Sequence, residues 1–373
     1  MVEIKKVITK SDINKFIKYP IELYKGSPYF VPYLNSDEKN KFDPKKNESY
    51  DNCITQAFLA YKDGKIVGRI LGIIQTLYNQ KVNEKRLRFS RFDSIDDAEV
   101  SNALFKAVED WGKAKGMELF HGPLGYNDWD REGLLIEGFD QPQTFEEQYN
   151  YDYYPKLVEA YGFKKETDWY EYRIFKPKQK IERIARISEM VLKRYDLKFI
   201  TIGKKDKFKK FVAKYKEGFF DCVNAAYAPL HGVVPLTDKV KEALTKQFLQ
   251  VLQKEYICLV VDKDDRVVAI GLAIPSLSES VSKSKGRLTL GVLMSIIRPK
   301  GFDFALIAVR PEYQGKGVNA VIMNYVVNYM REKNIPHAET NLMLEDNSKI
   351  QKQWEDFDYI QHKKRRCYVK GIK

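Results

Sequence analysis

The sequence predicts an α/β protein in which one unit of strands and helices occurs twice. The segment 58–74 has two apolar runs around a Lys-Asp-Gly turn, which is typical of a β-hairpin, and 258–274 repeats this arrangement. Later in each half, near 100–111 and 318–330, apolar residues recur at the i, i+3, i+4 and i+7 positions of one helical face. Similar features in the same order predict an internal repeat.

Both halves also end in the same way, with a short helix, a turn and a strand at 156–175 and 352–371. The repeat therefore predicts two domains, residues 1–178 and 197–373. The intervening residues 179–196 carry isoleucine and valine at helical spacing. They predict an amphipathic linker helix that lies across the junction between the domains.

The composition is that of a globular protein. The chain has 373 residues, of which 44% are apolar and 31% charged, enough for a sizeable core. No window approaches the roughly 18 consecutive apolar residues of a membrane span, and the first residues lack the apolar core of a signal peptide. We therefore expect a cytoplasmic location. The four cysteines are scattered without metal-ligand spacing, so we expect reduced thiols and no metal.

The formal net charge of +13 suits phosphates, nucleic acid or an anionic membrane surface, and it equally fits a lysine-rich solvated surface. Basic residues are densest in the tail, 362–373. The sequence patterns of common nucleic-acid-binding modules are absent. Nucleic acid is therefore not an expected partner.

A glycine-rich turn at 310–318 joins a predicted strand, 304–309, to the second long helix. Gly315 and Gly317 let the backbone fold closely around an anion, and the unpaired N–H groups of the first helical turn point at it. Lys316 adds positive charge between the glycines. The pattern predicts a phosphate or pyrophosphate site, and the alternative is a tight, solvated strand-to-helix turn.

This turn resembles the acyl-CoA pyrophosphate loop of the GNAT acyltransferases, whose pattern is Gln/Arg-x-x-Gly-x-Gly/Ala. Gln314, Gly317 and Asn319 occupy its three defined positions, with Asn319 where a small residue is usual. The resemblance implies acyl-CoA as co-substrate, and in each half a mixed sheet that splays between its fourth and fifth strands. The implied cofactor-binding residues are Ile307, Val309, Gln314, Gly315, Lys316, Gly317, Val318, Asn319 and Asn347.

Two parts of that set have separate roles. A backbone N–H near Ile307 to Val309 would polarise the thioester carbonyl. Asn347 matches an asparagine that GNAT proteins commonly place near the pantetheine arm. It also suits the N-cap of the helix expected after it, and both roles can hold at once.

A larger resemblance spans nearly the whole chain. Its motifs look like those of a family of bacterial tandem-GNAT proteins, whose members are mostly described as acyltransferase-like. The resemblance implies transfer of an acyl group from CoA to an amine acceptor. The motifs lie at 122–163, 285–291, 310–318, 344–347 and 365–369.

The two copies differ at the phosphate-binding position. Aligning their helices places Asp96, Asp97 and Glu99 opposite the residues of the glycine-rich turn. Carboxylates at a helix N-terminus satisfy the helix dipole themselves, and they would repel a pyrophosphate. We therefore expect the acyl-CoA site in the C-terminal copy and none in the N-terminal copy.

Acyl transfer to an amine needs a base for the ammonium proton and an acid, or water, for the leaving thiolate. In many GNAT enzymes a tyrosine of the last helix is the acid, but the aligned residue here is Trp354. Water, Tyr313 or Tyr359 could replace it, or the protein is not a catalyst. Glu339 and Glu345, at the expected splay, are the candidate bases, and a pair of solvated carboxylates is the alternative.

The long connection 122–145 is rich in acidic and aromatic residues. A connection of this length in a compact domain is usually functional. Tyr126, Asp128, Trp129 and Asp130 are the predicted acceptor-binding residues, because charge and cation–π attraction could hold a cationic amine. The alternative is a structural lid that packs the domains together.

An apolar stretch, 288–297, precedes the predicted fourth strand of the second half. Leu290, Leu293, Met294 and Ile297 share one helical face, and basic residues flank it, as in an interfacial helix. Some proteins with these motifs are thought to acylate sphingoid-type amines. Together these features predict a donor longer than acetyl and peripheral association with the inner membrane. The alternatives are a helix buried as ordinary core, a soluble small-amine acetyltransferase, and a non-catalytic protein that senses acyl-CoA.

Overall fold

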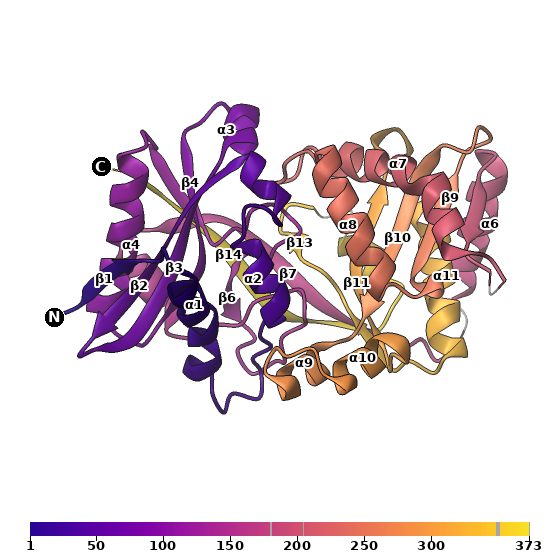
Figure 1. The fold of residues 1–373 in the computed structure, drawn as a ribbon. Helices are drawn as coiled ribbons and strands as arrows, with labels where there is room; N and C mark the ends of the chain where they lie inside the picture. The colour runs from indigo at the N-terminus through magenta and orange to yellow at the C-terminus, as the bar shows by residue number, and fades with distance from the viewer. Residues whose placement is uncertain (180, 204, 348–350, 373) are drawn as a thin grey trace.

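The computed structural model describes residues 1–179, 181–203, 205–347 and 351–372 of the chain. Strands and helices alternate along the chain, and helices lie on both faces of the strands (Figure 1). The predicted α/β class is therefore confirmed.

The first half contains the predicted hairpin, and its turn has two residues. Asp63 (φ 51°) and Gly64 (φ 76°) both adopt left-handed conformations, which match the twist of a tight hairpin. The strands are β1 (Glu3–Lys6), β2 (Cys53–Lys62), β3 (Lys65–Gln75), β4 (Arg86–Ser94), β5 (Leu119–Gly122), β6 (Leu134–Glu137) and β7 (Lys164–Phe175). The helices are α1 (Lys10–Leu23), α2 (Asn35–Lys41), α3 (Thr76–Val82), α4 (Ala98–Lys113) and α5 (Tyr154–Ala160), with a 3-10 turn, η1 (Glu48–Asp51).

The second half repeats this order after helix α6. Its strands are β8 (Lys198–Thr201), β9 (Ile257–Val261), β10 (Val267–Pro275), β11 (Phe302–Val309), β12 (His337–Glu339), β13 (Met343–Leu344) and β14 (Tyr359–Gly371). Its helices are α6 (Glu182–Arg194), α7 (Phe208–Tyr227), α8 (Asp238–Val251), α9 (Ser278–Ser284), α10 (Leu290–Ile297) and α11 (Asn319–Glu332), with 3-10 turns η2 (Lys254–Tyr256), η3 (Pro311–Tyr313) and η4 (Lys352–Trp354).

One mixed sheet of fourteen strands, counted over the described residues, runs through both halves. Its order is β1-β2-β3-β4-β5-β14-β7-β12-β11-β10-β9-β8, with β6 beside β14 and β13 beside β7. In each half, the fourth and fifth strands are parallel, which gives the predicted mixed sheet. In the second half, α7 lies against β10 and β11, and α11 packs on the opposite face.

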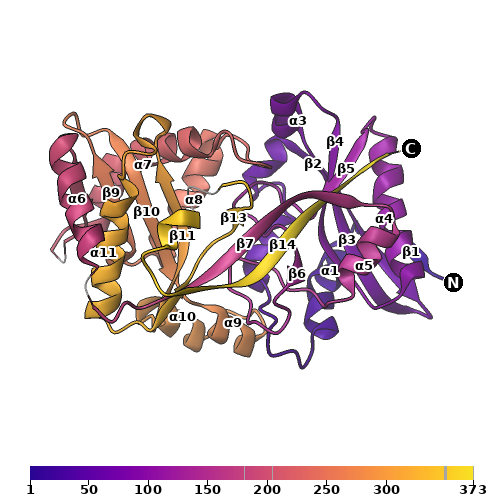
Figure 2. The ribbon, with the colours of Figure 1, turned by 180° about the vertical axis from the view of Figure 1, so that it is seen from behind.

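The final strands of the two halves are exchanged. The strand β14, from the second half, pairs with β5 of the first, whereas β7 of the first half pairs with β12 of the second. The two exchanged strands also pair with each other, antiparallel, along most of their length (Figure 2). Each half therefore completes its sheet with a strand from the other, an arrangement that the internal repeat did not indicate.

The helix expected to lie across the junction between the halves lies elsewhere. Helix α6 packs beside α11, at the end of the molecule away from the first half (Figure 1). Ile187 and Val191 of α6 join the apolar cluster that contains Val318 and Ile322. The predicted spacing of apolar residues is correct, but they cover α11 rather than the junction.

Helices α9 and α10 bridge the halves below the crossing of the exchanged strands (Figure 1). Val281 and Val292 pack with Val31 of the first half in a small apolar cluster. The backbone also crosses here, because the N–H of Asn35 donates to the carbonyl of Gly286 at 2.8 Å.

Candidate functional site

The turn between β11 and α11 has the geometry of an anion site. Gly315 (φ 73°) and Gly317 (φ 78°) adopt left-handed conformations that other residues rarely take. Within the described residues, no side chain caps the N-terminus of α11. The N–H groups of Ala320 and Val321 donate to the carbonyls of Gly317 and Val318 at 3.0 and 3.1 Å. The N–H groups of Val318 and Asn319, at the positive end of the helix dipole, are therefore the ones available to a phosphate. A Cβ on Gly317 would lie 3.3 Å from Val191 Cγ2, so the turn also lies close to α6.

The side chains of the turn play different parts. Lys316 Nζ lies 5.4 Å from the ring centroids of both Tyr195 and Tyr313, which holds its positive charge beside the turn. Gln314 Nε2 donates to the carbonyl of Val309 at 3.0 Å and ties the turn to β11. The side chain of Val318 is buried, so only its backbone can face a ligand.

The corresponding helix of the first half already holds carboxylates. Asp97 caps α4 by accepting a hydrogen bond from the N–H of Glu99 at 2.8 Å. Lys62 Nζ lies 2.7 Å from Asp97 and 3.4 Å from Glu99, and this hydrogen bonding lowers the pKa of Asp97. A pyrophosphate at this position would have to displace a carboxylate that is held in place.

Strands β11 and β12 separate after one contact. In the described residues they share a single register pair, Asp303 with Glu339. The register of β11 against β10 leaves Ala305 as a bulged residue without a partner. Asn341 Nδ2 donates to the carbonyl of Ala305 at 2.7 Å, across the opening between the strands.

The backbones of Ile307 and Val309 face this opening. The carbonyl of Ile307 accepts a hydrogen bond from the Tyr227 hydroxyl at 3.3 Å, and that of Val309 accepts from Gln314. The N–H and C=O groups of one strand residue point to the same edge of the strand. Their N–H groups are therefore directed at the splay, as the predicted contact with a thioester carbonyl requires.

The carboxylate of Glu339, a predicted base, contacts the guanidinium of Arg173 and the imidazole of His362. Its carboxylate lies 2.6 Å from Arg173 Nε and 2.7 Å from His362 Nε2. Burial opposes ionisation, but the hydrogen bond from His362 and the positive charges nearby lower the pKa of Glu339 to about 2. A carboxylate with so low a pKa is a weak base at neutral pH.

Glu345 and Tyr313 lie apart from Glu339. Glu345 pairs with Lys165 Nζ at 2.6 Å and accepts a hydrogen bond from the N–H of Asp168 at 3.1 Å. Tyr313 packs with the cluster between α6 and α11, beside the glycine-rich turn. The structure does not bring these three predicted catalytic residues together.

Trp354 is a core residue. It is fully buried, its ring packs against Phe304 and Phe357, and its Nε1 donates to Met343 Sδ at 3.3 Å. In this position Trp354 stabilises the core, and its side chain does not replace the tyrosine that donates a proton in many GNAT enzymes. The N-cap role considered for Asn347 concerns residues 348–350, which lie outside the described part of the chain.

Two of the four predicted acceptor-binding residues hold the first half together. Tyr126 is buried, with its hydroxyl 3.3 Å from that of Tyr50. Asp130 is buried between Arg91 at 3.1 Å and Lys41 at 2.8 Å. Burial opposes ionisation of Asp130, yet the positive charge of Arg91 lowers its pKa. Both residues have the contacts of a structural core.

The other two reach the second half. The ring of Trp129 lies 5.7 Å from that of Phe248 on α8. Burial and, after it, the negative charge of Asp128 raise the pKa of Tyr227, whose hydroxyl contacts β11 at the splay. Burial raises the pKa of Asp128 to about 6, and its Oδ1 has no hydrogen-bond partner among the described residues. These contacts agree with the alternative prediction, in which the long connection is a structural lid between the two halves. Within the described part of the chain, the carboxylate of Asp128 keeps an unpaired oxygen there.

Asp303 is a buried carboxyl at the splay that the sequence interpretation did not include. Burial and the nearby Glu339 raise its pKa to about 7, and its Oδ2 has no hydrogen-bond partner in the described residues. The signal was present in the sequence, because this is the only charged residue in the run Phe302–Val309.

The apolar face of α10 points outward. Its large residues are 40% to 75% exposed, and basic residues on either side of the helix are exposed as well. The exposed apolar residues are Leu288, Leu290, Leu293, Met294 and Ile297, and the basic ones are Lys283, Lys285, Arg287, Arg298 and Lys300. The alternative of a helix buried as ordinary core is therefore wrong for this face. Among the described residues, no helix is both long enough and apolar enough to cross a bilayer.

Comparisons with known proteins agree with this fold and with the position of the turn. The acetyltransferase (GNAT) family model matches residues 231–354. The chain is 28% identical to Protein YghO of Escherichia coli (strain K12), over 98% of this chain and 94% of that protein. It is 26% identical to the bacterial ceramide synthase of Caulobacter vibrioides (strain NA1000 / CB15N), over 76% of this chain and 72% of that protein.

Among solved structures, a tandem GNAT protein from the clavulanic acid biosynthesis pathway shares the fold. The two superpose with a TM-score of 0.59 over 100% of this chain and 99% of that one, at 8% sequence identity. The family match covers the splay and the turn of the second half, and the whole chain has the fold of a tandem GNAT protein. Together with the two relatives, these findings support an acyltransferase of the GNAT type.

Proposed function

We propose that the second half binds acyl-CoA and transfers its acyl group to an amine bound between the two halves. The observation that carries the proposal is the continuity between the opened strand β11 and the uncapped turn 314–319. A pyrophosphate at the turn would direct the rest of the cofactor along β11 into the opening. The held carboxylates at α4 argue against a second site in the first half.

The residues of the opening can support acyl transfer without a covalent enzyme intermediate. Acyl-CoA supplies the thioester. The N–H groups of Ile307 and Val309 would donate to its carbonyl oxygen and stabilise the negative charge that develops there. The amine nitrogen bonds to the acyl carbon as the carbon–sulfur bond breaks, and the further proton that the nitrogen loses passes through water to the released thiolate.

Asp128 would accept the proton that the ammonium group loses. Its charge acts on Tyr227, whose hydroxyl contacts β11, and its pKa, raised by burial to about 6, suits a base that works near neutral pH. Its unpartnered oxygen could first hold the ammonium group and then take its proton. Glu339 and Glu345 are weaker candidates because cationic partners occupy both carboxylates.

A long-chain amine at a membrane surface is the proposed acceptor. The relative from Caulobacter vibrioides is named a ceramide synthase, and a ceramide is an N-acylated long-chain amine. The exposed apolar face of α10, with its basic flanks, suits the surface of an anionic bilayer. Because α9 and α10 also bridge the two halves, an amine taken from the bilayer would enter at the junction between the halves.

Release of the CoA thiol tests the reaction. Purified protein is supplied with acyl-CoAs from acetyl to stearoyl, each with a long-chain amine in anionic vesicles or with a pool of small amines. We expect the highest rate with a long acyl chain and the long-chain amine. Asp128→Asn should lower kcat by about 100-fold or more and remove the rise in rate near pH 6, because a general base contributes at least that much.

Each other outcome has a distinct meaning. Fast turnover of acetyl-CoA with small amines alone would replace the lipid acceptor by a soluble small amine. No thiol release with any pair, together with CoA binding, would leave an acyl-CoA sensor. Normal kinetics in Asp128→Asn would remove this residue from the reaction. Asp140→Asn, in an exposed part of the same long connection, is the matched control and should react like the wild type.

A further inference from the structure

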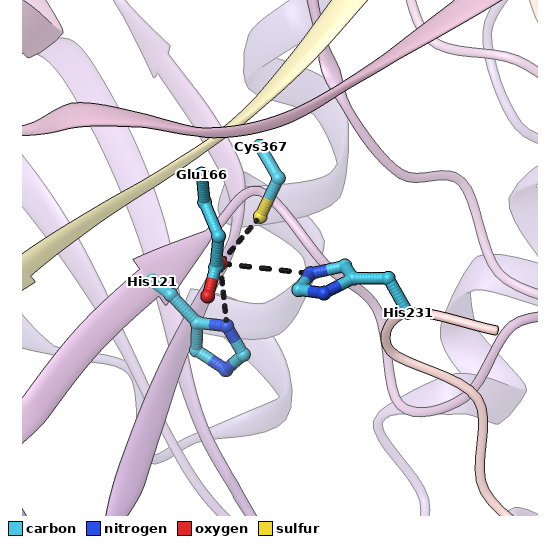
Figure 3. Close-up of side chains that lie close together, drawn as sticks. All are labelled: His121, Glu166, His231 and Cys367. Atoms are coloured by element: carbon cyan, nitrogen blue, oxygen red, sulfur yellow. Dashed lines mark hydrogen bonds and ion pairs between the residues drawn. The ribbon is translucent and has the colours of Figure 1, made fainter. Parts of the chain in front are cut away.

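A second cluster of reactive side chains lies where the exchanged strands meet the two halves, and the proposed acyl transfer does not use it. His121 lies on β5, Glu166 on β7, Cys367 on β14, and His231 in the loop between α7 and α8. Their side chains converge, with Glu166 in the middle (Figure 3). One ligand atom from each residue lies within 4.8 Å of all the others.

The distances are close to those of a tetrahedral metal site. Glu166 Oε2 lies 3.3 Å from His121 Nδ1, 3.5 Å from His231 Nε2 and 3.4 Å from Cys367 Sγ. Zinc–ligand bonds of about 2.0 to 2.3 Å place tetrahedral ligand atoms roughly 3.3 to 3.8 Å apart. The three contacts to Glu166 already fall in this range, and the wider separations need to close by about 1 Å.

The donor set is also that of zinc. Two imidazoles, a thiolate and a carboxylate suit a borderline-soft ion, whereas calcium and magnesium prefer oxygen ligands alone. A neutral imidazole donates the lone pair of its unprotonated nitrogen to a metal, and His121 Nδ1 and His231 Nε2 both face Glu166 Oε2. Among the described residues, His231 Nε2 has no hydrogen-bond partner although it is buried. A buried polar atom of this kind costs free energy unless something pairs with it.

The surrounding charges are compatible with a divalent ion. The thiolate of Cys367 and the carboxylate of Glu166 would balance two positive charges. Metal binding would release the proton of the Cys367 thiol, because the thiolate is the form that binds a metal. Arg86 pairs with Glu84 and with the other oxygen of Glu166, which orients the carboxylate toward the cluster. Arg86 Nη1 also lies 3.2 Å from His121 Nδ1, so a bound ion would displace the guanidinium from that nitrogen.

We propose that His121, Glu166, His231 and Cys367 form a structural zinc site that joins the two halves. Four protein ligands close the coordination shell, which is typical of structural rather than catalytic zinc. The ion would fasten both exchanged strands to β5 and would fix the loop that follows Tyr227. The site goes beyond acyl transfer, and it replaces the expectation, drawn from cysteine spacing, of a protein without metal.

Metal content tests the site directly. Full-length protein from zinc-supplemented cells is dialysed without chelator and measured by plasma mass spectrometry. We expect about one zinc per chain in the wild type, and little in Cys367→Ala or His231→Gln, because each loses one of four ligands. Matched controls outside the cluster, Cys258→Ala and His337→Gln, should keep the metal.

Two further measurements allow for variants that fold poorly. Cobalt-loaded wild type should show a thiolate-to-cobalt absorption band that Cys367→Ala lacks. Stripping the wild type with dipicolinate should lower its Tm, and zinc but not magnesium should restore it, because a ligand that binds the folded state stabilises it. The proposal is overturned if the wild type holds no zinc and gains none on titration at micromolar concentration. Retention of stoichiometric zinc by both cluster variants would overturn it as well.

Discussion

Ionisation of the buried Asp303 carboxyl group lowers the stability of the folded state. Burial and Glu339 raise its pKa to about 7, whereas the ordinary value for aspartate is 3.8. The folded state therefore binds more protons than the unfolded state between about pH 4 and pH 7, and the contribution of this group to stability falls as pH rises through that window. Ser276 and Lys363 favour its ionised form, and Glu146 disfavours it.

Asp303→Asn should remove this dependence. The variant should gain on the wild type as pH rises from 4.5 to 8, by roughly 2 to 4 kcal/mol of unfolding free energy, because the amide is never ionised. Urea unfolding at several pH values measures the difference between the two proteins. Parallel pH curves for the two proteins would mean that Asp303 is solvated in solution.

Particular residues show what the sequence could predict at this scale. The glycine-rich pattern predicts a turn that needs backbone freedom at Gly317, and the φ of 78° at this residue agrees. The position of Glu345 after the predicted fifth strand makes it a candidate base, but its partner Lys165 comes from the other half, 180 positions away. A pairing of that kind depends on the exchanged strands, so no local pattern could indicate it.

Helix α10 shows how one element relates to a surface. Val292 anchors it to the bridge between the halves, whereas Leu290 and Leu293 remain exposed. If α10 contacts the bilayer, these leucines insert among the lipids and the basic flanks hold anionic headgroups. Because Leu290 and Leu293 are exposed, their apolar side chains contribute little to the stability of the fold.

Replacing both leucines by serine should separate membrane binding from stability. Transfer of a leucine from water to an apolar phase is worth about 1.5 to 3 kcal/mol, so the double variant should bind anionic vesicles at least about tenfold more weakly. The unfolding free energy should change by less than about 0.5 kcal/mol per site, because both side chains are exposed.

Sedimentation with vesicles measures the bound fraction. The matched control replaces two exposed apolar residues elsewhere, Ile54→Ser and Met190→Ser, and should bind like the wild type. Equal loss in both double variants, or no sedimentation of the wild type, would remove α10 from any membrane contact.

At the scale of the whole molecule, the sequence predicted the repeat but not the exchange. Each half carries strands whose number, order and apolar pattern recur in the other. The alternation of apolar and polar residues along a strand determines which face is buried, but not which strand lies beside it. From sequence, β7 and β14 would therefore fit beside the fifth strand of either half. The zinc ligands are hidden for the same reason, since they come from four distant elements.

The exchange also explains a buried ionic cluster. Glu171 of β7 pairs with Lys363 at 3.0 Å and Arg365 at 2.5 Å, both on β14, and all three are almost fully buried. Such pairs add little net stability, but an unpaired member would be costly. We infer that they fix the register of the exchanged strands.

We expect the chain to have one acyl-CoA site although its two halves are similar, and titration calorimetry with CoA measures the number of sites. One CoA should bind per chain, with binding lost in Gly317→Glu, because a side chain at φ 78° whose Cβ lies 3.3 Å from Val191 Cγ2 would distort the turn. Glu99→Gly in the first half should bind one CoA like the wild type, since Asp97 still caps α4. Two bound CoA molecules per chain, or normal binding by Gly317→Glu, would contradict this expectation.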